Sequence, residues 1–170
     1  CCRHCATISC APPGNLEQEY ASAMYALGVM YEHGEGVEQS YEKAFEYYEQ
    51  AAQLGHASAQ YNLGNMYRDG IGVTQSYVRA KEYFESAAEQ GVVDAMSSLA
   101  GLYANGQGVE TDLTKARELW TNAAEQGTEQ GREIAVNNLK KLDDMERQMA
   151  ALDPNAIVCS ACGLPQTPTR

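Results

Sequence analysis

The sequence predicts an all-α fold, in which antiparallel pairs of helices stack one after another into an α-solenoid. One block of sequence occurs three times, starting at residues 23, 59 and 95, and no insertion or deletion separates the copies. Within each copy the apolar residues recur at the spacing of a helix rather than of a strand. Self-similarity at a fixed period of this length indicates a repeat array, in which each unit stacks only on its neighbours.

The first helix of each copy is indicated by Ala, Leu and Tyr at spacing i, i+4 and i+8, which places them on one stripe of a helix. The three sets are Ala23, Leu27 and Tyr31; Ala59, Leu63 and Tyr67; and Ala95, Leu99 and Tyr103. We expect this stripe to face the core. Gly28 and Gly64 lie inside the same helices, where glycine costs about 1 kcal/mol relative to alanine. The sequence therefore predicts that another helix approaches closely at these glycines.

The second helix of each copy carries an alanine, an aromatic residue four positions later, and then a pair of alanines. The three sets are Ala44, Tyr48, Ala51 and Ala52; Ala80, Phe84, Ala87 and Ala88; and Ala116, Trp120, Ala123 and Ala124. Alanine lets two helix axes approach each other, and we expect the aromatic side chain to fill the gap between layers. Each copy is thus predicted to be two amphipathic helices.

A Gly-x-Gly-Val segment joins the two helices in every copy, at residues 34–37, 70–73 and 106–109. Its first glycine suits the left-handed residue that ends a helix, and we expect its valine to pack back into the core. Ser40, Ser76 and Asp112 occupy one slot directly before the second helix, where N-cap residues are preferred. A Gly-x-Gly sequence can also indicate a phosphate-binding loop, but here it follows a helix and not a strand, which favours the structural interpretation.

Taken together, the repeated positions read A-x-x-x-L-G-x-M-Y-x-x-G-x-G-V-x-x-S-x-x-K-A-x-E-Y-Y-x-x-A-A-x-x-G. This pattern resembles the Sel-1-like repeat, a relative of the tetratricopeptide repeat, over residues 21–128. The resemblance implies a right-handed superhelix with the first helices on its concave face, and a role as adaptor or scaffold. The family spans organelle quality-control adaptors, activators of membrane enzymes and bacterial interaction proteins, so the fold alone does not select one function.

The chain is accordingly divided into four segments. They are a cysteine-rich segment with a linker (1–15), three Sel-1-like repeats (20–128), a C-terminal capping helix (129–152) and a tail with a Cys-x-x-Cys pair (153–170). We expect the capping helix because Ala135 and Leu139 restart the apolar stripe, no Gly-x-Gly-Val follows, and repeat arrays need a polar cap. The chain begins with cysteine and stops soon after another cysteine pair, so we expect it to be a fragment of a longer protein.

All six cysteines lie outside the repeats, and two Cys-x-x-Cys pairs have the spacing of zinc knuckles: Cys2 with Cys5, and Cys159 with Cys162. Zinc requires four ligands, so each pair needs partners. The segment around Cys159 resembles the opening of a MYND-type zinc finger, which implies further ligands beyond Arg170. A redox pair or chance spacing remains an alternative there, and free thiols are the alternative at the N-terminal pair. A thioredoxin-like interpretation fails because no βαβ pattern surrounds either pair.

The composition is acidic, with 23 Asp and Glu against 12 Lys and Arg and a net charge of −11. This charge argues against direct binding of nucleic acid, which favours clustered basic residues. It favours basic or neutral protein partners, although it also aids solubility. No apolar run approaches the roughly 20 residues of a membrane span. Reduced cysteines with zinc would suit the cytoplasm or nucleus, whereas family members of the secretory pathway carry signal peptides that this sequence would not reveal.

Catalysis has little support in the sequence. The slot of His33 holds Asp69 and Asn105 in the other copies, and the slot of His56 holds valine and threonine. A general base should not be interchangeable with valine, and no nucleophile and base occur together. We therefore expect an interaction scaffold and not an enzyme. The alternative is a regulatory or activator region of a larger enzyme whose catalytic domain lies outside these residues.

Comparison of the three copies predicts where a partner binds. The core slots of the first helix hardly vary between the copies. Three other slots of this helix, spaced i, i+3 and i+7, vary freely. In the middle copy they hold Asn62, Asn65 and Asp69; in the flanking copies they hold Ala26, Val29 and His33, and Ser98, Gly101 and Asn105. Amide and carboxylate groups suit the backbone and basic side chains of an extended peptide. The alternative is that these positions are merely solvated.

Overall fold

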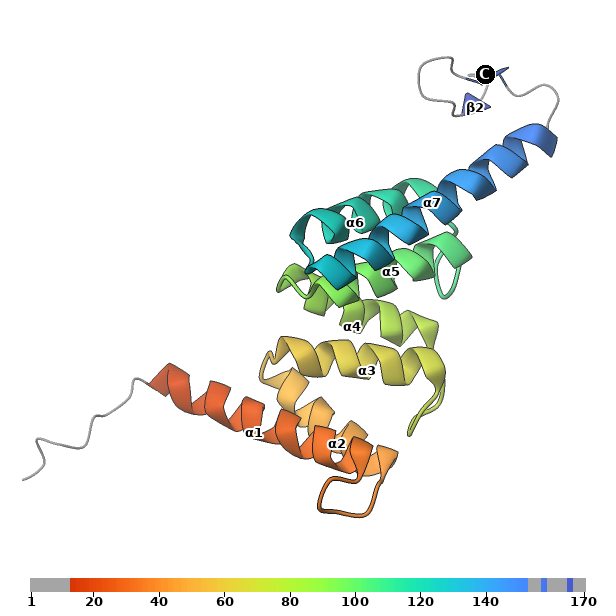
Figure 1. The fold of residues 1–170 in the computed structure, drawn as a ribbon. Coiled ribbons are helices and arrows are strands. Elements are labelled where there is room, and N and C mark those ends of the chain that lie inside the picture. Colours follow the sequence, from red (N-terminus) through yellow and green to blue (C-terminus); the bar gives the residue numbers. More distant parts are fainter. Residues whose placement is uncertain (1–12, 153–156, 159–164, 167–170) are drawn as a thin grey trace, which may run out of the picture. The chain divides into compact units, whose positions relative to one another are not determined.

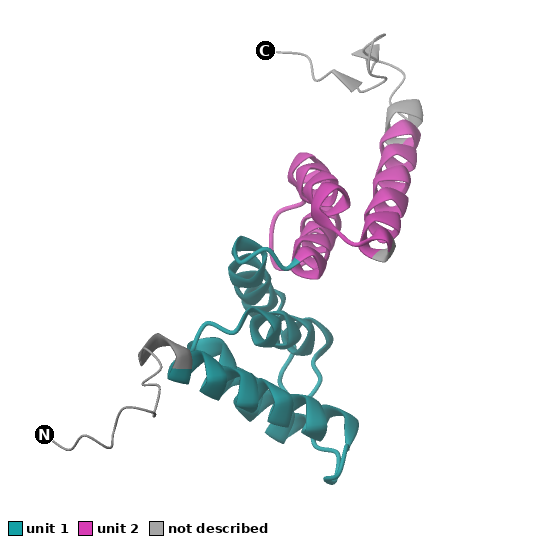
Figure 2. Cartoon of the chain, turned by 60° about the vertical axis from the view of Figure 1, so that its left-hand side comes forward, with its two compact units in different colours: residues 1–92 teal, residues 93–170 magenta. Residues whose placement is uncertain are grey.

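The computed structural model describes residues 13–152, 157–158 and 165–166 (Figure 1). Within this range the chain is helical apart from the connections and one pair of two-residue strands. The predicted all-α helical-repeat solenoid is confirmed. The chain divides into two compact units, residues 1–92 and 93–170 (Figure 2), and each is described by itself.

The described residues of unit 1 form four helices: α1 (Pro13–His33), α2 (Tyr41–Gln53), α3 (Ala57–Asp69) and α4 (Tyr77–Glu89). Helix α1 packs against α2, α2 also packs against α3, and α3 packs against α4. The unit is therefore two consecutive helix pairs, in which the second helix of the first pair covers the first helix of the next.

Helix α1 begins at Pro13, inside the segment that the sequence analysis assigned to a linker. Proline is tolerated in the first turn of a helix because its missing N–H would have no partner there in any case. The Pro-Pro-Gly sequence suggested a linker, but these residues can equally open a helix when apolar and polar residues of helical spacing follow.

In the described part of unit 2 there are three helices, α5 (Val93–Asn105), α6 (Leu113–Gln126) and α7 (Glu129–Leu152), followed by strands β1 (Ile157–Val158) and β2 (Pro165–Gln166). Helix α5 packs against α6, and α6 packs against α7. The two strands pair in antiparallel fashion. Helix α7 thus occupies the segment for which the sequence predicts a cap, and it lies on the last helix pair.

The predicted helix ends are found in all three copies. The side chains of Ser40, Ser76 and Asp112 accept a hydrogen bond from the backbone N–H three residues later, at 3.3, 3.4 and 2.9 Å. Each N-cap thereby satisfies one of the free N–H groups at the start of a helix. Gly70 has the predicted left-handed backbone, with φ of +70°, and its N–H donates to the carbonyl of Met66.

The glycines inside the first helices leave room for aromatic rings of the second helices. A Cβ added to Gly28 would lie 2.5 Å from the ring of Tyr48, and one added to Gly64 would lie 2.4 Å from the ring of Phe84. The predicted close approach is therefore confirmed. It occurs within a helix pair, between the first and second helix, and not between successive layers as the sequence analysis expected for the aromatic residue.

The core follows the predicted stripes in the second and third copies, where Ala59, Leu63, Ala95 and Leu99 are buried. The aromatic residues of the second helices are buried as well. The first copy differs from the prediction: Ala23 is exposed, and Leu27 and Tyr31 are only half-buried. The reason is that α1 has α2 on one side, and no described helix of unit 1 covers the stripe on the other.

Candidate partner-binding surface

The three predicted residues of the middle copy lie on one face of α3, as their spacing requires. Asn62 and Asn65 are half-buried, whereas Asp69 is exposed at the end of the helix. Along this face the two amides are therefore partly covered, and the carboxylate at the end of the helix is open to solvent. His33 is exposed at the corresponding end of α1, and Asn105 ends α5 in unit 2.

The carboxylate of Glu32 in α1 is linked to this face of α3 through Tyr48. The hydroxyl of the fully buried Tyr48 donates a hydrogen bond to Oε2 of Glu32 at 2.5 Å. Burial, and then the hydrogen bond and charge of Glu32, hold the pKa of Tyr48 well above its usual range, while a hydrogen bond to Asn62 opposes the shift. The hydroxyl of Tyr48 therefore donates to Glu32 of α1 and accepts from Asn62 of α3, which links the two side chains. Glu32 was not among the predicted site residues, because its slot holds Arg68 and Ala104 in the other copies.

Asn65 has an unsatisfied acceptor. Its Oδ1 atom is enclosed, and it has no hydrogen-bond partner among the described residues. Buried polar atoms in folded proteins nearly always have a partner, and each exception calls for an explanation. Because the atom is enclosed, a donor from outside reaches it only if the side chain of Asn65 changes its rotamer.

Asp69 is already engaged by its neighbour. The guanidinium of Arg68 binds both carboxylate oxygens of Asp69, with two distances of 2.8 Å. The hydrogen bond from Arg68 holds the pKa of Asp69 below its usual value, so the carboxyl is ionised but its charge is balanced. The sequence predicts that the carboxylate of Asp69 suits a basic side chain of the partner, whereas in the structure this carboxylate is already paired with Arg68.

Unit 2 has a cavity at the corresponding face of α5. Its volume is about 330 Å³, and it is bounded by Gly101 and Asn105 of α5, Trp120 of α6, and Leu142 and Met145 of α7. The predicted residue Asn105 therefore lies at a hollow. The contribution of α7 was missed, because α7 is not a copy of the repeat and its register could not be read from the other helices.

A second cavity, of about 350 Å³, lies in unit 1 beside Tyr67, Arg79 and Tyr83. Arg79 lies 5.4 Å from the ring centroid of Tyr67 and donates to its hydroxyl at 3.0 Å. The same pairing of a basic side chain with the tyrosine ring recurs in the other copies, as Lys43 with Tyr31 and Lys115 with Tyr103. Because the pairing recurs in every copy, we interpret it as part of the repeat itself, where it joins the end of the first helix to the start of the second.

The four predicted zinc ligands, Cys2, Cys5, Cys159 and Cys162, lie outside the described residues. Among the residues that the structure does describe, no cluster of three or more His, Cys, Asp or Glu side chains could hold a metal ion.

No helix in the described part of the chain combines the length and the apolar character needed to cross a membrane. This agrees with the absence of a long apolar run in the sequence.

Comparison with known proteins identifies the repeat. The Sel1 repeat family matches residues 21–56, 57–92 and 93–128. The comparison with curated proteins found no match.

Solved structures provide three neighbours. A Sel1 repeat protein from Oxalobacter formigenes is 33% identical with a TM-score of 0.63, over 67% of this chain and 47% of that one. A protective antigen of uropathogenic Escherichia coli strains, described as displaying an SLR fold, is 43% identical with a TM-score of 0.64, over 68% of this chain and 25% of that one. Cysteine-rich protein B of Helicobacter pylori is 22% identical with a TM-score of 0.54, over 71% of this chain and 93% of that one, and shows the fold alone.

The chain thus spans less than half the length of the first two neighbours. The family match nevertheless covers more than half of the chain, in three adjoining copies and in the same register as the helix pairs of the structure. The chain belongs to the Sel1 repeat family.

Proposed function

We propose that this protein is an interaction scaffold that binds a segment of a protein partner on the face of α3 in unit 1 that carries Asn62, Asn65 and Asp69. Proteins built from Sel1 repeats generally mediate protein–protein interactions. A binding role is also consistent with the way the copies differ, because their core slots are shared and the slots of this face are not.

The variation of these three slots between the copies, beside a constant core stripe, is the observation that carries the proposal. The amide groups of Asn62 and Asn65, both half-buried, can pair with backbone groups of an extended segment. Glu32 lies beside the same face through Tyr48 and Asn62, and the whole chain is acidic. These charges favour a basic or neutral segment over an acidic one.

The test uses two variants with the same change of charge. Asn65→Arg with Asp69→Arg alters the proposed face and places a second cation beside Arg68. Glu46→Arg with Gln50→Arg alters two exposed positions of α2 in the same unit. Each pair raises the net charge by three, so non-specific electrostatic effects are matched.

The wild type and the two variants are each used to capture binding partners from the source cell. We expect unchanged far-UV circular dichroism for both variants, loss of partners for the α3 variant, and retention of partners for the α2 variant. Equal sets of partners from the wild type and the α3 variant would contradict the proposed site. Loss of partners from both variants would show that net charge, and not this face, governs capture.

On the spacing of the cysteines alone, we also propose that Cys159 and Cys162 bind zinc in a longer form of the protein, and Cys2 and Cys5 in a second site, which would suit the cytoplasm or nucleus. Two thiolates supply half the ligands of one ion, so this chain should hold zinc weakly. A chain extended beyond Arg170 should hold it tightly and lose it on Cys159→Ser. Tight zinc that survives this substitution would contradict the assignment.

A further inference from the structure

The cavity of unit 2 results from three shortened side chains. In α3 the slots around the aromatic ring of the second helix hold Tyr61, Asn65 and Arg68, and in α5 they hold Ser97, Gly101 and Ala104. In unit 1 the ring of Phe84 is enclosed, with the ring of Tyr61 and the guanidinium of Arg68 each 6.0 Å from its centroid. A Cβ added to Gly101 would meet no atom within 4 Å. The space that unit 1 fills is thus open in unit 2.

The cavity has an apolar side, formed by Trp120, Leu142 and Met145. Trp120 presents its ring from α6, and its indole N–H donates to the carbonyl of Ser97 at 3.2 Å, so its orientation is fixed. On the side of α7, Leu142 is buried, whereas Met145 is 46% exposed. Large apolar side chains that remain exposed beside a hollow are typical of surfaces that bind another molecule. The volume of about 330 Å³ is at the small end of ligand pockets and suits one or two side chains.

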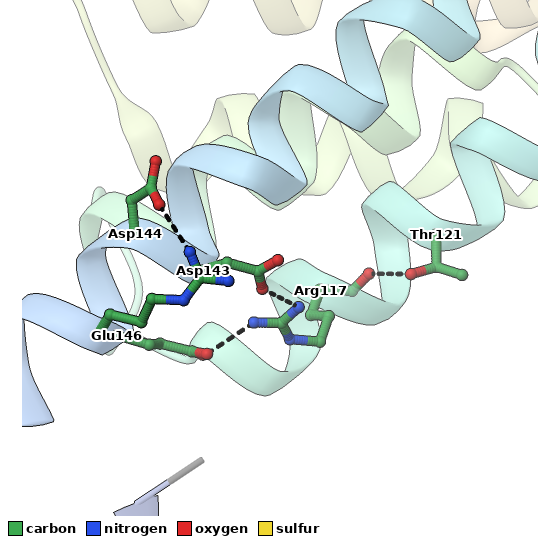
Figure 3. Close-up of polar contacts among 6 residues, drawn as sticks. Arg117, Thr121, Asp143, Asp144 and Glu146 are labelled. Carbon is green, nitrogen blue, oxygen red and sulfur yellow. Dashed lines mark hydrogen bonds and ion pairs between the residues drawn. The ribbon is translucent and has the colours of Figure 1, made fainter. Parts of the chain in front are cut away.

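The charged groups beside the cavity are Lys141, which lines it, and the ion pairs of α6 and α7. Arg117 of α6 binds both Asp143 and Glu146 of α7, each at 2.7 Å (Figure 3). Asp144 in turn pairs with Arg147 at 3.2 Å. Each of these three carboxylates of α7 is therefore paired with an arginine, although the three carboxylates outnumber the two arginines by one. Lys141 lines the cavity, and no ion-pair partner is found for it among the described residues.

Two amides lie at the same rim. Asn105 from the end of α5 and Asn138 from α7 line the cavity together with Lys141. Each amide supplies N–H₂ donors beside its acceptor oxygen, and the ammonium group of Lys141 is a donor only. No carboxylate lines the cavity. The rim is therefore suited to an acceptor with negative charge, although the protein as a whole carries a net charge of −11.

We propose that this cavity is a binding site for a peptide segment in which a bulky apolar side chain is flanked by carboxylates. The apolar side chain enters between Trp120 and Met145, and a flanking carboxylate contacts Lys141 and the amides. The site lies entirely in unit 2 and prefers the opposite charge to the face of α3. It is therefore separate from the proposed function, and each can fail without the other.

Trp120 makes the proposal measurable, because it is the single tryptophan of the chain and forms a wall of the cavity. The probes are three short peptides with blocked ends and the central sequences Asp-Phe-Glu, Asp-Ala-Glu and Lys-Phe-Lys, titrated into the full 170-residue chain. We expect saturable change of tryptophan emission with Asp-Phe-Glu, with a dissociation constant between about 10 μM and 1 mM, since so small a contact yields only a few kcal/mol. At least tenfold weaker binding is expected for the other two peptides.

Two variants test the site itself. Gly101→Leu should fold, because its side chain enters open space, and it should abolish the response by filling the cavity. Lys141→Glu should weaken Asp-Phe-Glu several-fold and strengthen Lys-Phe-Lys. The α3 variant, Asn65→Arg with Asp69→Arg, should respond like the wild type. No response to Asp-Phe-Glu, a response that survives Gly101→Leu, or equal binding of all three peptides would overturn the proposal.

Discussion

Helices α1 and α3 carry the same stripe of Ala, Leu and Tyr, yet only the stripe of α3 is buried. Leu63 in α3 is fully enclosed, whereas Leu27 in α1 is half-buried and Ala23 is exposed. Helix α2 covers the stripe of α3, and no described helix of unit 1 takes that place beside α1. The comparison shows that the pattern of a repeat indicates which face can be buried, while the neighbouring repeat determines whether it is.

The exposed stripe of α1 continues toward the start of the helix. Leu16 and Tyr20 are 64% and 53% exposed, and they precede Ala23 and Leu27 at helical spacing. The equivalent residues of a covered helix would contribute to stability, since each fully buried large apolar side chain is worth roughly 1.5–3 kcal/mol. Substitutions in the two helices can therefore separate the effect of the sequence pattern on stability from the effect of packing against a neighbouring helix.

The largest effect is expected at the buried leucine. Leu63→Ala should lower the free energy of unfolding by about 2–5 kcal/mol, because it leaves a cavity between α2, α3 and α4. Leu27→Ala removes the same atoms from a half-buried site and should cost less than half as much. Chemical unfolding followed by circular dichroism measures both. Equal losses would mean that α1 is covered as α3 is.

An intermediate effect is expected at the two kinds of glycine. Gly64→Ala forces a methyl group onto the ring of Phe84 and should destabilise by about 1–3 kcal/mol despite the better helix propensity of alanine. Gly101→Ala enters open space and should stabilise by up to about 1 kcal/mol. Melting temperatures that move in opposite directions would support this contrast, whereas loss of stability in both variants would show that α5 is also tightly packed at Gly101.

The smallest effect concerns His56, which caps α3 and has no counterpart at the start of α1. Its Nδ1 accepts from the N–H of Ala59 at 3.3 Å, and its ring stacks on Tyr25 at 4.6 Å. Burial lowers the pKa of His56 below the ordinary value of 6.5. The unfolded chain therefore binds a proton first as the pH falls, so the stability contributed by neutral His56 is present above pH 6.5 and is lost below it, down to the folded pKa.

The matching experiment compares the wild type with His56→Ser, which retains an N-cap side chain but cannot titrate. The wild type should lose more thermal stability than the variant between pH 7.5 and pH 5.5. Parallel losses would show that groups other than His56 account for the pH dependence.

Much of the fold could be predicted because the three copies of the repeat can be aligned with one another. Three copies in one register showed which slots are constant, and these slots proved to be N-caps such as Ser76, left-handed glycines such as Gly70, and the core residue Leu63. The exposure of Ala23 could not be predicted in this way, because it depends on what lies beside α1 and not on the repeat itself.

The candidate sites were predicted less completely. The variable face of α3 was identified, but the pairing of Asp69 with Arg68 and the role of Glu32 depend on side-chain geometry that spacing does not specify. The cavity of unit 2 needs α7, whose residues have no copy for comparison. A signal was present in the small residues Ser97, Gly101 and Ala104, which replace larger ones at the same slots.

The central claim is that partners bind the variable slots of the first helices and not the outer positions of the second helices. It is tested most directly by placing a photo-crosslinking amino acid at position 69 of α3 or at position 46 of α2, both of which are exposed, and irradiating each protein in the source cell. The account predicts covalent adducts with partner proteins from position 69 and none above background from position 46. Adducts from position 46 alone, or equal adducts from both, would contradict it.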